Sequence, residues 1–275
     1  MKCAWTELLS ILPVNLREEV DKLGRNSLQE LRLRLDRPPE LVFGNTSLWL
    51  TRMTSAADIS FVVNTASKYS PWAAATVRDG YITAAGGHRI GMCGECVVQN
   101  GGISGIRNVT SLCIRVARDI TGISPQIRKE HGSVLILGPP GSGKTTMLRD
   151  IVRKLSEAAP ITVVDERNEV FPIGGGFTYG PRTDVLTNCS KSQGIITALR
   201  SMAPAWIAVD EISAQEDCAA MLQAGWCGVR LIATAHAADK RDFATRPVYA
   251  PLATSGIFDS LLILRSDKSW RIERM

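Results

Sequence analysis

The segment LILGPPGSGKTTMLRD, from Leu135 to Asp150, constrains the fold more than any other part of the chain. Gly138 to Thr145 fits the pattern G-x-x-x-x-G-K-[ST] completely, with an apolar strand expected before it and a helix after it. In that context the amides of the glycine-rich turn and the helix N-terminus hold phosphate oxygens. The segment therefore predicts a nucleotide-binding α/β domain.

Further apolar strands follow this turn and alternate with helical patterns. ITVVDE, WIAVDE and VRLIATAH each run from apolar residues into polar ones. Such alternation is typical of a parallel, mostly covered sheet, which binds its ligand at the carboxyl ends of the strands. We therefore expect the chemically active residues at these strand ends.

The residues of the glycine-rich turn have distinct expected roles. Lys144 would neutralise the β- and γ-phosphates, and Thr145 would ligate Mg²⁺. No N-K-x-D sequence follows to read guanine, so we expect ATP with Mg²⁺. The residues expected to bind the nucleotide are Gly138, Pro139, Pro140, Gly141, Ser142, Gly143, Lys144, Thr145 and Thr146.

Two acidic residues end the strand WIAVDE. Asp210 would hold Mg²⁺ through water, and Glu211 would polarise the attacking water. Adjacent acids after an apolar strand are common, but downstream of a complete phosphate loop they predict a metal-dependent nucleotide hydrolase.

Two other strand ends carry further candidates. ITVVDERNEV brings Asp165, Glu166 and Glu169 to the same edge, where one would position water or metal. A solvated loop or a helix cap is an equally good interpretation for any single one of them. ATAHA presents Thr234 and His236 where a sensor of the γ-phosphate is often needed, although a lone histidine is as often structural.

The first hundred or so residues carry no nucleotide motif. Apolar spacing predicts a helix over WTELLSILPVNLREEVDKL and another over AADISFVVNTASKYS. Glycine and asparagine turns then predict a small antiparallel sheet from Val77 to Ala117. The polar, proline-containing stretch ARDITGISPQIRKEHGS separates this region from the phosphate loop. We expect an N-terminal α+β domain with its linker over residues 1–130 and an ATPase domain over residues 131–275.

Leucine and arginine alternate in the segment LQELRLRLDRPPELVF. Leu31, Leu33 and Leu35 would line one face of a strand, with Arg32 and Arg34 on the other. The arginines form either a solvated strand face or a stripe that binds a polyanion or a partner.

Composition and charge indicate where the protein is located and what it can bind. No apolar run approaches the roughly 20 residues that span a bilayer, and the start MKCAWTELLS lacks the pattern of a signal peptide. We therefore expect a cytosolic protein. The net charge of +5 permits an acidic partner or a membrane surface but does not demand one.

The four strand ends, in this order, resemble those of the motor ATPases of type II and type IV secretion and pilus systems. ITVVDER stands for their acidic box, GIITALRSMAPAWIAVDEI for their second acidic strand and ATAHAAD for their histidine box. Those motors usually carry glycine at the position of Asp210, whereas this chain has aspartate. Whether Glu211 or Glu166 activates water stays open at this point.

Within that superfamily the chain resembles the stage III sporulation protein AA family. LRLRLDRPPEL, GHRIGMCGE, IRVARDI, RTDVL, RSMAP and VDEI carry the resemblance. It implies a RecA-like P-loop ATPase domain with a parallel core sheet, preceded by a smaller α+β domain. It also implies a mother-cell ATPase that powers a secretion-like channel to the forespore during endospore formation.

The resemblance extends to location and assembly. It implies a cytoplasmic protein peripheral to the membrane, whose partners are other stage III sporulation channel proteins. The motors are rings of six, in which arginines of a neighbour close the site. Arg115 and Arg118, in IRVARD, are the candidates here, and an ordinary salt-bridge or surface role is an equal alternative for each.

Two alternative functions remain at the level of sequence. One is a P-loop ATPase that binds nucleic acid, since relatives with this core carry a single-strand-binding module. The chain ends at SLLILRSDKSWRIERM, a predicted closing hairpin, and we expect no nucleic-acid partner. The other alternative is a nucleotide-dependent switch with little turnover.

Overall fold

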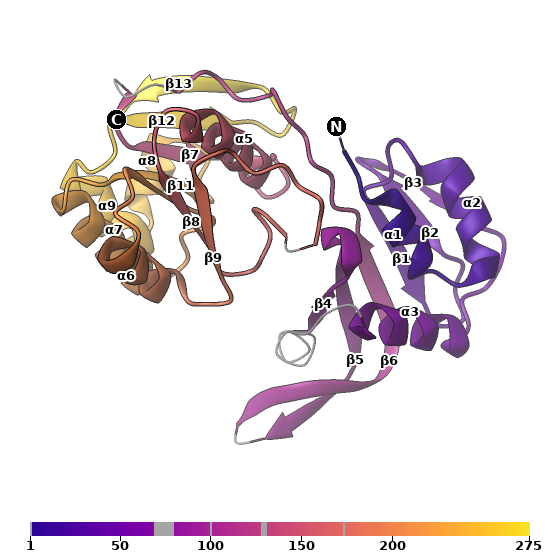
Figure 1. Ribbon diagram of the computed structural model, residues 1–275. Helices are drawn as coiled ribbons and strands as arrows, with labels where there is room; N and C mark the ends of the chain where they lie inside the picture. Colours follow the sequence, from indigo (N-terminus) through magenta and orange to yellow (C-terminus); the bar gives the residue numbers. More distant parts are fainter. Residues whose placement is uncertain (1, 69–79, 100, 128–130, 173) are drawn as a thin grey trace. The chain divides into compact units, whose positions relative to one another are not determined.

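The computed structural model describes residues 2–68, 80–99, 101–127, 131–172 and 174–275. The chain divides into two compact units (Figure 1). The first is Met1–Asp119 together with Pro172–Phe177, and the second is Ile120–Phe171 together with Thr178–Met275. The boundary expected after residue 130 stays a prediction, because residues 128–130 lie outside the described residues.

In its described residues, the first unit consists of an antiparallel sheet, three α-helices and a short 3-10 helix. Its elements are α1 (Trp5–Ser10), α2 (Val14–Gly24), β1 (Glu30–Arg34), β2 (Glu40–Phe43), β3 (Thr46–Trp49), α3 (Ala56–Lys68), β4 (Tyr81–Thr83), the short 3-10 helix η2 (Ala85–Gly87), β5 (Arg89–Gln99) and β6 (Gly102–Arg115). The six strands lie in the order β3-β2-β1-β6-β5-β4, and every neighbouring pair is antiparallel.

A proline divides the first expected helix. α1 ends at Ser10, and α2 begins at Val14 directly after Pro13. Proline lacks the N–H that would continue a helix, but it is favoured at a helix start. The helix expected over AADISFVVNTASKYS is present as α3 up to Lys68, and its last two residues lie outside the described residues. The same holds for the start of the sheet expected from Val77.

The alternating pattern of β1 has the expected two faces. Leu31 and Leu33 are fully buried, while Leu35 falls after the strand and is half-buried. On the other face Arg32 forms an ion pair with Glu30 and Arg34 forms one with Glu40, both at 2.7 Å. Both arginines of this strand face are therefore ion-paired with glutamates.

The β5–β6 hairpin is longer than the sheet around it. β1 pairs with β6 only over Ser111–Arg115, and β4 pairs with β5 only over Arg89–Gly91. The outer part of the hairpin consequently extends as a two-stranded ribbon (Figure 1). Its apolar side chains Val98 and Ile103 are exposed there.

The second unit is an α/β domain around a mostly parallel sheet. Its elements are β7 (Val134–Leu137), α5 (Lys144–Ser156), β8 (Ile161–Asp165), β9 (Thr183–Thr187), α6 (Lys191–Ser201), β10 (Trp206–Val209), α7 (Gln215–Trp226), β11 (Arg230–Ala235), α8 (Lys240–Thr245), the 3-10 helix η4 (Pro247–Tyr249), α9 (Ala250–Ser255), β12 (Ser260–Leu264) and β13 (Trp270–Arg274). The seven strands lie in the order β13-β12-β7-β11-β10-β8-β9.

All neighbouring strands of this sheet are parallel except β12 and β13, which form the expected closing hairpin. The residues of β7, β8, β10 and β12 are buried throughout, as the apolar runs predict. β8 and β10 are neighbours with Val164 opposite Val209, so their following acids leave the sheet at the same level. The expected architecture, an α/β domain with a parallel core sheet preceded by a smaller α+β domain, is confirmed.

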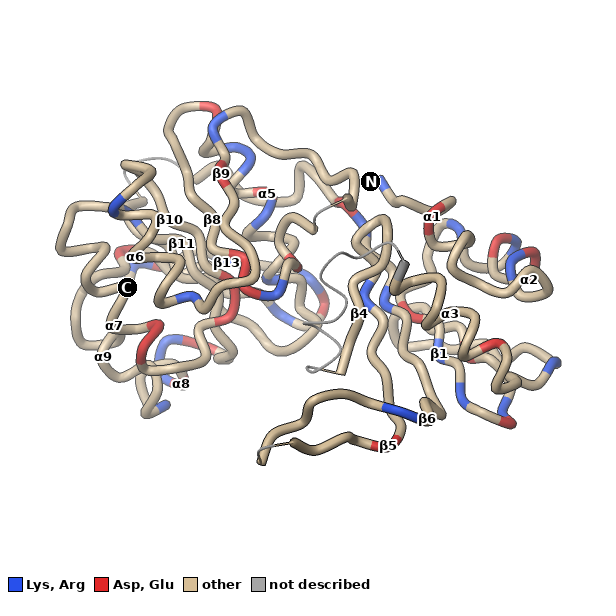
Figure 2. Tube along the Cα trace, turned by 60° about the horizontal axis from the view of Figure 1, so that its bottom comes forward, with Lys and Arg blue, Asp and Glu red and all other residues tan. Residues whose placement is uncertain are grey.

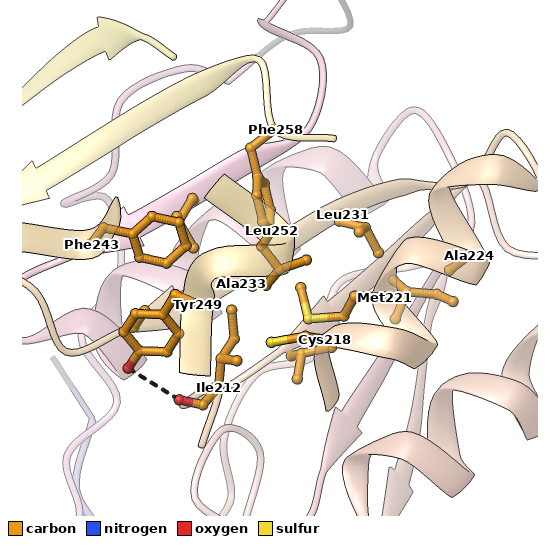
Figure 3. Close-up of a cluster of buried hydrophobic side chains, with 14 of the residues drawn as sticks. Ile212, Cys218, Met221, Ala224, Leu231, Ala233, Phe243, Tyr249, Leu252 and Phe258 are labelled. Carbon is orange, nitrogen blue, oxygen red and sulfur yellow. Dashed lines mark hydrogen bonds between the residues drawn. The ribbon is translucent and has the colours of Figure 1, made fainter. Parts of the chain in front are cut away.

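A buried apolar cluster supports one side of the sheet (Figure 3). It contains Met221 of α7, Leu231 of β11 and Leu252 of α9, all fully buried. Burying one such side chain contributes about 1.5–3 kcal/mol. The Tyr249 hydroxyl in this cluster donates to the carbonyl of Ile212 at 3.3 Å, as the dashed line shows. The chain just beyond the β10 strand end is therefore fixed to the core.

Among the described residues, none of the helices combines the length and the apolar character needed to cross a bilayer.

Candidate nucleotide site

The glycine-rich turn joins β7 to α5 and needs glycine at specific positions. Gly141 and Gly143 have φ of +71° and +95°, a region that side chains disfavour. A Cβ on Gly138 would lie 2.6 Å from Ser142 Oγ and 3.0 Å from the carbonyl oxygen of Leu264. Ser142 Oγ is buried and has no hydrogen-bond partner among the described residues. The turn thus has the close backbone approach and the open polar atom that suit a phosphate ligand.

Lys144 begins α5 and is buried, with 7% of its surface exposed. Its Nζ donates to the carbonyls of Gly138 at 2.8 Å and Pro139 at 2.9 Å, and lies 3.1 Å from Nδ1 of His236. Burial lowers the pKa of Lys144, and the carboxylate of Asp210 opposes that shift. An ammonium group only donates, so Nδ1 of His236 accepts this bond. His236, which directly follows β11, therefore lies beside Lys144, which follows the glycine-rich turn after β7.

Asp210 joins three separate segments of the second unit. Its Oδ2 accepts from Thr145 Oγ1 at 2.7 Å, and its Oδ1 accepts from Thr234 Oγ1 at 2.6 Å. The amide of Glu211 donates to the same Thr234 hydroxyl at 2.7 Å. A threonine hydroxyl beside a carboxylate is a donor set that suits Mg²⁺. Thr145 and Asp210, both predicted from sequence to hold the metal, are thus in direct contact.

Glu211 follows Asp210 in a left-handed conformation, with φ of +53°. Its carboxylate contacts two basic side chains. Oε2 accepts from Arg167 at 2.9 Å, and Oε1 lies 3.5 Å from Nε2 of His236. Glu211 is therefore linked through His236 to Lys144 of the phosphate loop.

Glu166, the other candidate acid, lies in a different environment. It pairs with Lys191 at the start of α6, whose side chain is only 5% exposed. Lys191 Nζ also lies 3.7 Å from Asp217 of α7. Asp217 accepts from the amide of Ser213 at 3.1 Å, which ties this ion pair to the chain after Glu211.

Asp165 serves the fold of its own loop. It is buried and accepts hydrogen bonds from the amides of Glu169 at 2.8 Å, Val170 at 3.0 Å and Phe171 at 2.9 Å. Burial raises its pKa to about 6, while the amide donors oppose the shift. Asp165 therefore closes the segment that carries Glu166 and Arg167.

Sequence reasoning did not single out three basic residues of this site. Arg167 binds Glu211, Lys191 binds Glu166, and Lys268 in the β12–β13 turn donates to the carbonyl of Gly141. Only Arg167 stood beside a quoted candidate, in DER. The other two come from segments with no strand-end signal.

Arg115 and Arg118 lie in the first unit. The Arg115 side chain is 64% exposed and lies 3.7 Å from Glu30. Arg118 donates to the carbonyls of Leu28 at 3.2 Å and Arg25 at 3.2 Å, so it fastens the end of α2. A role of either arginine toward a neighbouring copy stays a prediction.

Two solved structures, of an ATPase and of a pilus motor, share this fold. The Legionella pneumophila ATPase DotB matches with a TM-score of 0.58 and 17% identity, over 96% of this chain and 80% of that chain. The pilus retraction motor PilT, solved with bound ADP, matches with a TM-score of 0.64 and 16% identity, over 94% of this chain and 82% of that chain. At these identities the likeness shows the fold alone. The chain therefore shares its fold with the ATPase DotB and the pilus retraction motor PilT.

Sequence comparison identifies the family. The family model described as sporulation stage III, protein AA matches residues 5–272. The stage III sporulation protein AA of Bacillus subtilis (strain 168) is 33% identical over 280 residues, which cover 95% of this chain and 91% of that protein. The chain belongs to the sporulation stage III protein AA family.

Proposed function

We propose that this protein hydrolyses ATP with Mg²⁺ as the motor of a sporulation-stage channel. The contact of Thr145 and Thr234 with the two oxygens of Asp210 carries the proposal. This contact lies at the start of α5, beside Lys144 of the phosphate loop, and its oxygen atoms are of the kind that Mg²⁺ prefers, which supports the proposal. A glycine turn that bound nothing would need neither the buried lysine nor this carboxylate.

The residues of the site have separate proposed roles in binding phosphate and metal. The turn amides and Lys144 would hold the phosphates and offset their charge, and Thr145 and Asp210 would hold Mg²⁺. The metal, when bound, would stabilise the charge that develops on the phosphate oxygens. Fixed donors of this kind need no rearrangement during the reaction.

Glu211 is the better candidate for orienting and activating water. Its backbone amide is fixed by Thr234, and its carboxylate is linked through His236 to Lys144. Glu166 is paired with the buried Lys191, whereas Arg167, the partner of Glu211, has a half-exposed side chain. A carboxylate held by a buried ammonium group is a poor general base, because the ion pair stabilises its charged form.

The decisive experiment removes the loop cation. Lys144→Ala should abolish ATP hydrolysis and weaken ATP binding, whereas Lys240→Ala, at an exposed position on α8, should change neither. Circular dichroism establishes that both variants fold. ATP turnover by Lys144→Ala at the wild-type rate would overturn the assignment.

The cellular role is proposed from the family and the fold together. The protein would act in the mother-cell cytoplasm at the membrane, as a homo-hexamer that contacts other stage III sporulation channel proteins. Support comes from family membership and from the fold shared with secretion and pilus motors. Affinity purification from sporulating cells, with Lys144→Ala as the matched bait, tests the partnership. Recovery of no membrane channel component with either bait would contradict it.

A further inference from the structure

Arg167 occupies a distinctive position in the candidate nucleotide site. It follows Asp165 and Glu166 at the end of β8, yet its guanidinium reaches across to β10 and binds Glu211 at 2.9 Å. The two side chains are 47% and 35% exposed. An ion pair this open contributes little to stability. The pair can therefore be broken at little cost in stability, so the guanidinium can change partners.

The backbone beneath Arg167 is firmly held. The amide of Asn168 donates to the carbonyl of Asp165 at 3.1 Å, and the Asp165 carboxylate accepts from three amides further along the loop. The loop therefore presents Arg167 from a fixed base. The guanidinium itself remains accessible to a ligand.

The partner of Arg167 belongs to the phosphate site. Glu211 contacts His236, and His236 contacts Lys144, which would hold the β- and γ-phosphates. The terminal phosphate of a bound triphosphate would bring new negative charge next to these groups. A guanidinium binds phosphate through two parallel N–H donors, so phosphate competes well with a single carboxylate oxygen.

We propose that Arg167 is a sensor of the terminal phosphate that acts within its own chain. In this inference, which rests on the proposed ATPase function, Arg167 exchanges the Glu211 carboxylate for the γ-phosphate of ATP. The exchange frees Glu211 to orient water only when a triphosphate is present. With ADP the terminal phosphate is absent, and Arg167 keeps its bond to Glu211.

Nucleotide affinities test this inference without needing turnover. Equilibrium binding of ADP and of a non-hydrolysable ATP analogue, both with Mg²⁺, should show that Arg167→Ala loses about tenfold in affinity for the triphosphate only. ADP affinity should stay within about twofold. Arg167→Lys keeps the charge but not the fork of donors, so it should recover part of the loss.

The control is Arg241→Ala, an exposed arginine of α8, which should bind both nucleotides like the wild type. Equal loss for both nucleotides in Arg167→Ala would show a merely structural role and overturn the inference. Unchanged affinity for both would also overturn it. Wild-type protein that binds neither nucleotide would instead overturn the proposed function, and the inference with it. If Arg167→Ala does not fold, the triphosphate-to-diphosphate ratio of Arg167→Lys decides.

Discussion

Thr145 Oγ1 donates a 2.7 Å hydrogen bond to Asp210 Oδ2, across 65 positions of sequence. The first residue belongs to the helix after the phosphate loop, and the second ends the central strand β10. Their contact joins the two strongest motifs of the sequence into one donor set.

Removing the charge of Asp210 should therefore disrupt metal use more than nucleotide binding. Asp210→Asn keeps the size of the side chain but removes the carboxylate that Mg²⁺ prefers. We expect ATP hydrolysis to fall at least about 100-fold and to require much higher Mg²⁺, as a titration of rate against metal would show. Asp184→Asn, on the exposed side of β9, is the control. An unchanged Mg²⁺ dependence in Asp210→Asn would contradict the assigned metal site.

Replacement of Glu211 and replacement of Glu166, the two candidate general bases, should lower the rate of ATP hydrolysis to very different extents. Glu211→Gln should still bind ATP with Mg²⁺, while its hydrolysis rate falls by roughly two orders of magnitude or more. Glu166→Gln should lose much less, because it disturbs an ion pair with Lys191 outside this chain of contacts. Single-turnover kinetics on the two variants make the comparison. The opposite ranking would move the base to the strand end of β8.

Asp165 should give stability a pH dependence of its own. Burial raises its pKa to about 6 in the folded state, against a value of 3.8 in the unfolded chain. The unfolded chain therefore loses its proton first, and the stability that Asp165 contributes at low pH is lost as pH rises from about 4 to about 6. A shift of about two pKa units corresponds to at most about 3 kcal/mol.

Urea denaturation of the wild type and of Asp165→Asn across this pH range isolates the effect. The difference in free energy of unfolding should move in favour of the variant as pH rises, because asparagine stays neutral. A difference that is flat between pH 4 and pH 7 would show that Asp165 keeps an ordinary pKa.

Assembly should raise the activity. We expect weak turnover in dilute protein, an increase in specific activity with concentration, and loss of that increase in Arg115→Ala or Arg118→Ala. Arg115→Ala is the cleaner test, because Arg118 also fastens backbone carbonyls near α2 and its loss should lower stability by about 1–3 kcal/mol. Sedimentation and activity measured on the same samples decide the matter. Flat specific activity from a monomer, with both variants fully active, would remove the ring motor.

Nucleic acid should bind weakly and should leave the rate of ATP hydrolysis unchanged. Arg32 and Arg34 are paired with acidic neighbours, and both basic and acidic residues occur along the traced chain of each unit (Figure 2). Binding to single-stranded DNA should therefore vanish near physiological salt, and neither DNA nor RNA should stimulate hydrolysis. Tight binding at that salt, together with faster turnover, would favour the nucleic-acid alternative.

Local patterns in the sequence predicted most of the second unit. The strand, turn and helix around Lys144 follow from one motif, and each apolar run became a buried strand. The proximity of Asp210 to Thr145 could be predicted because the carboxyl ends of parallel strands lie at one edge of the sheet.

Side-chain contacts between neighbouring strands and loops could not be predicted in the same way. The pairing of Arg167 with Glu211 depends on β8 lying beside β10, and strand order leaves no trace in hydrophobic periodicity. The same is true of Lys191 and Lys268, which come from helix and turn segments. The break between α1 and α2 at Pro13 was not predicted, because the helical spacing of apolar residues continues on both sides of the proline.

The neighbouring strands β8 and β10 each deliver a pair of acids, and the two pairs are used alike. In each pair the first acid binds groups of the fold, as Asp165 and Asp210 do, and the second binds a basic side chain. The sheet thus carries two neighbouring strand ends at which a basic side chain holds a carboxylate, with a buried partner at Glu166 and a half-exposed partner at Glu211. Replacing a single basic partner, Lys191 or Arg167, would therefore change which of the two carboxylates is free, with no change in topology.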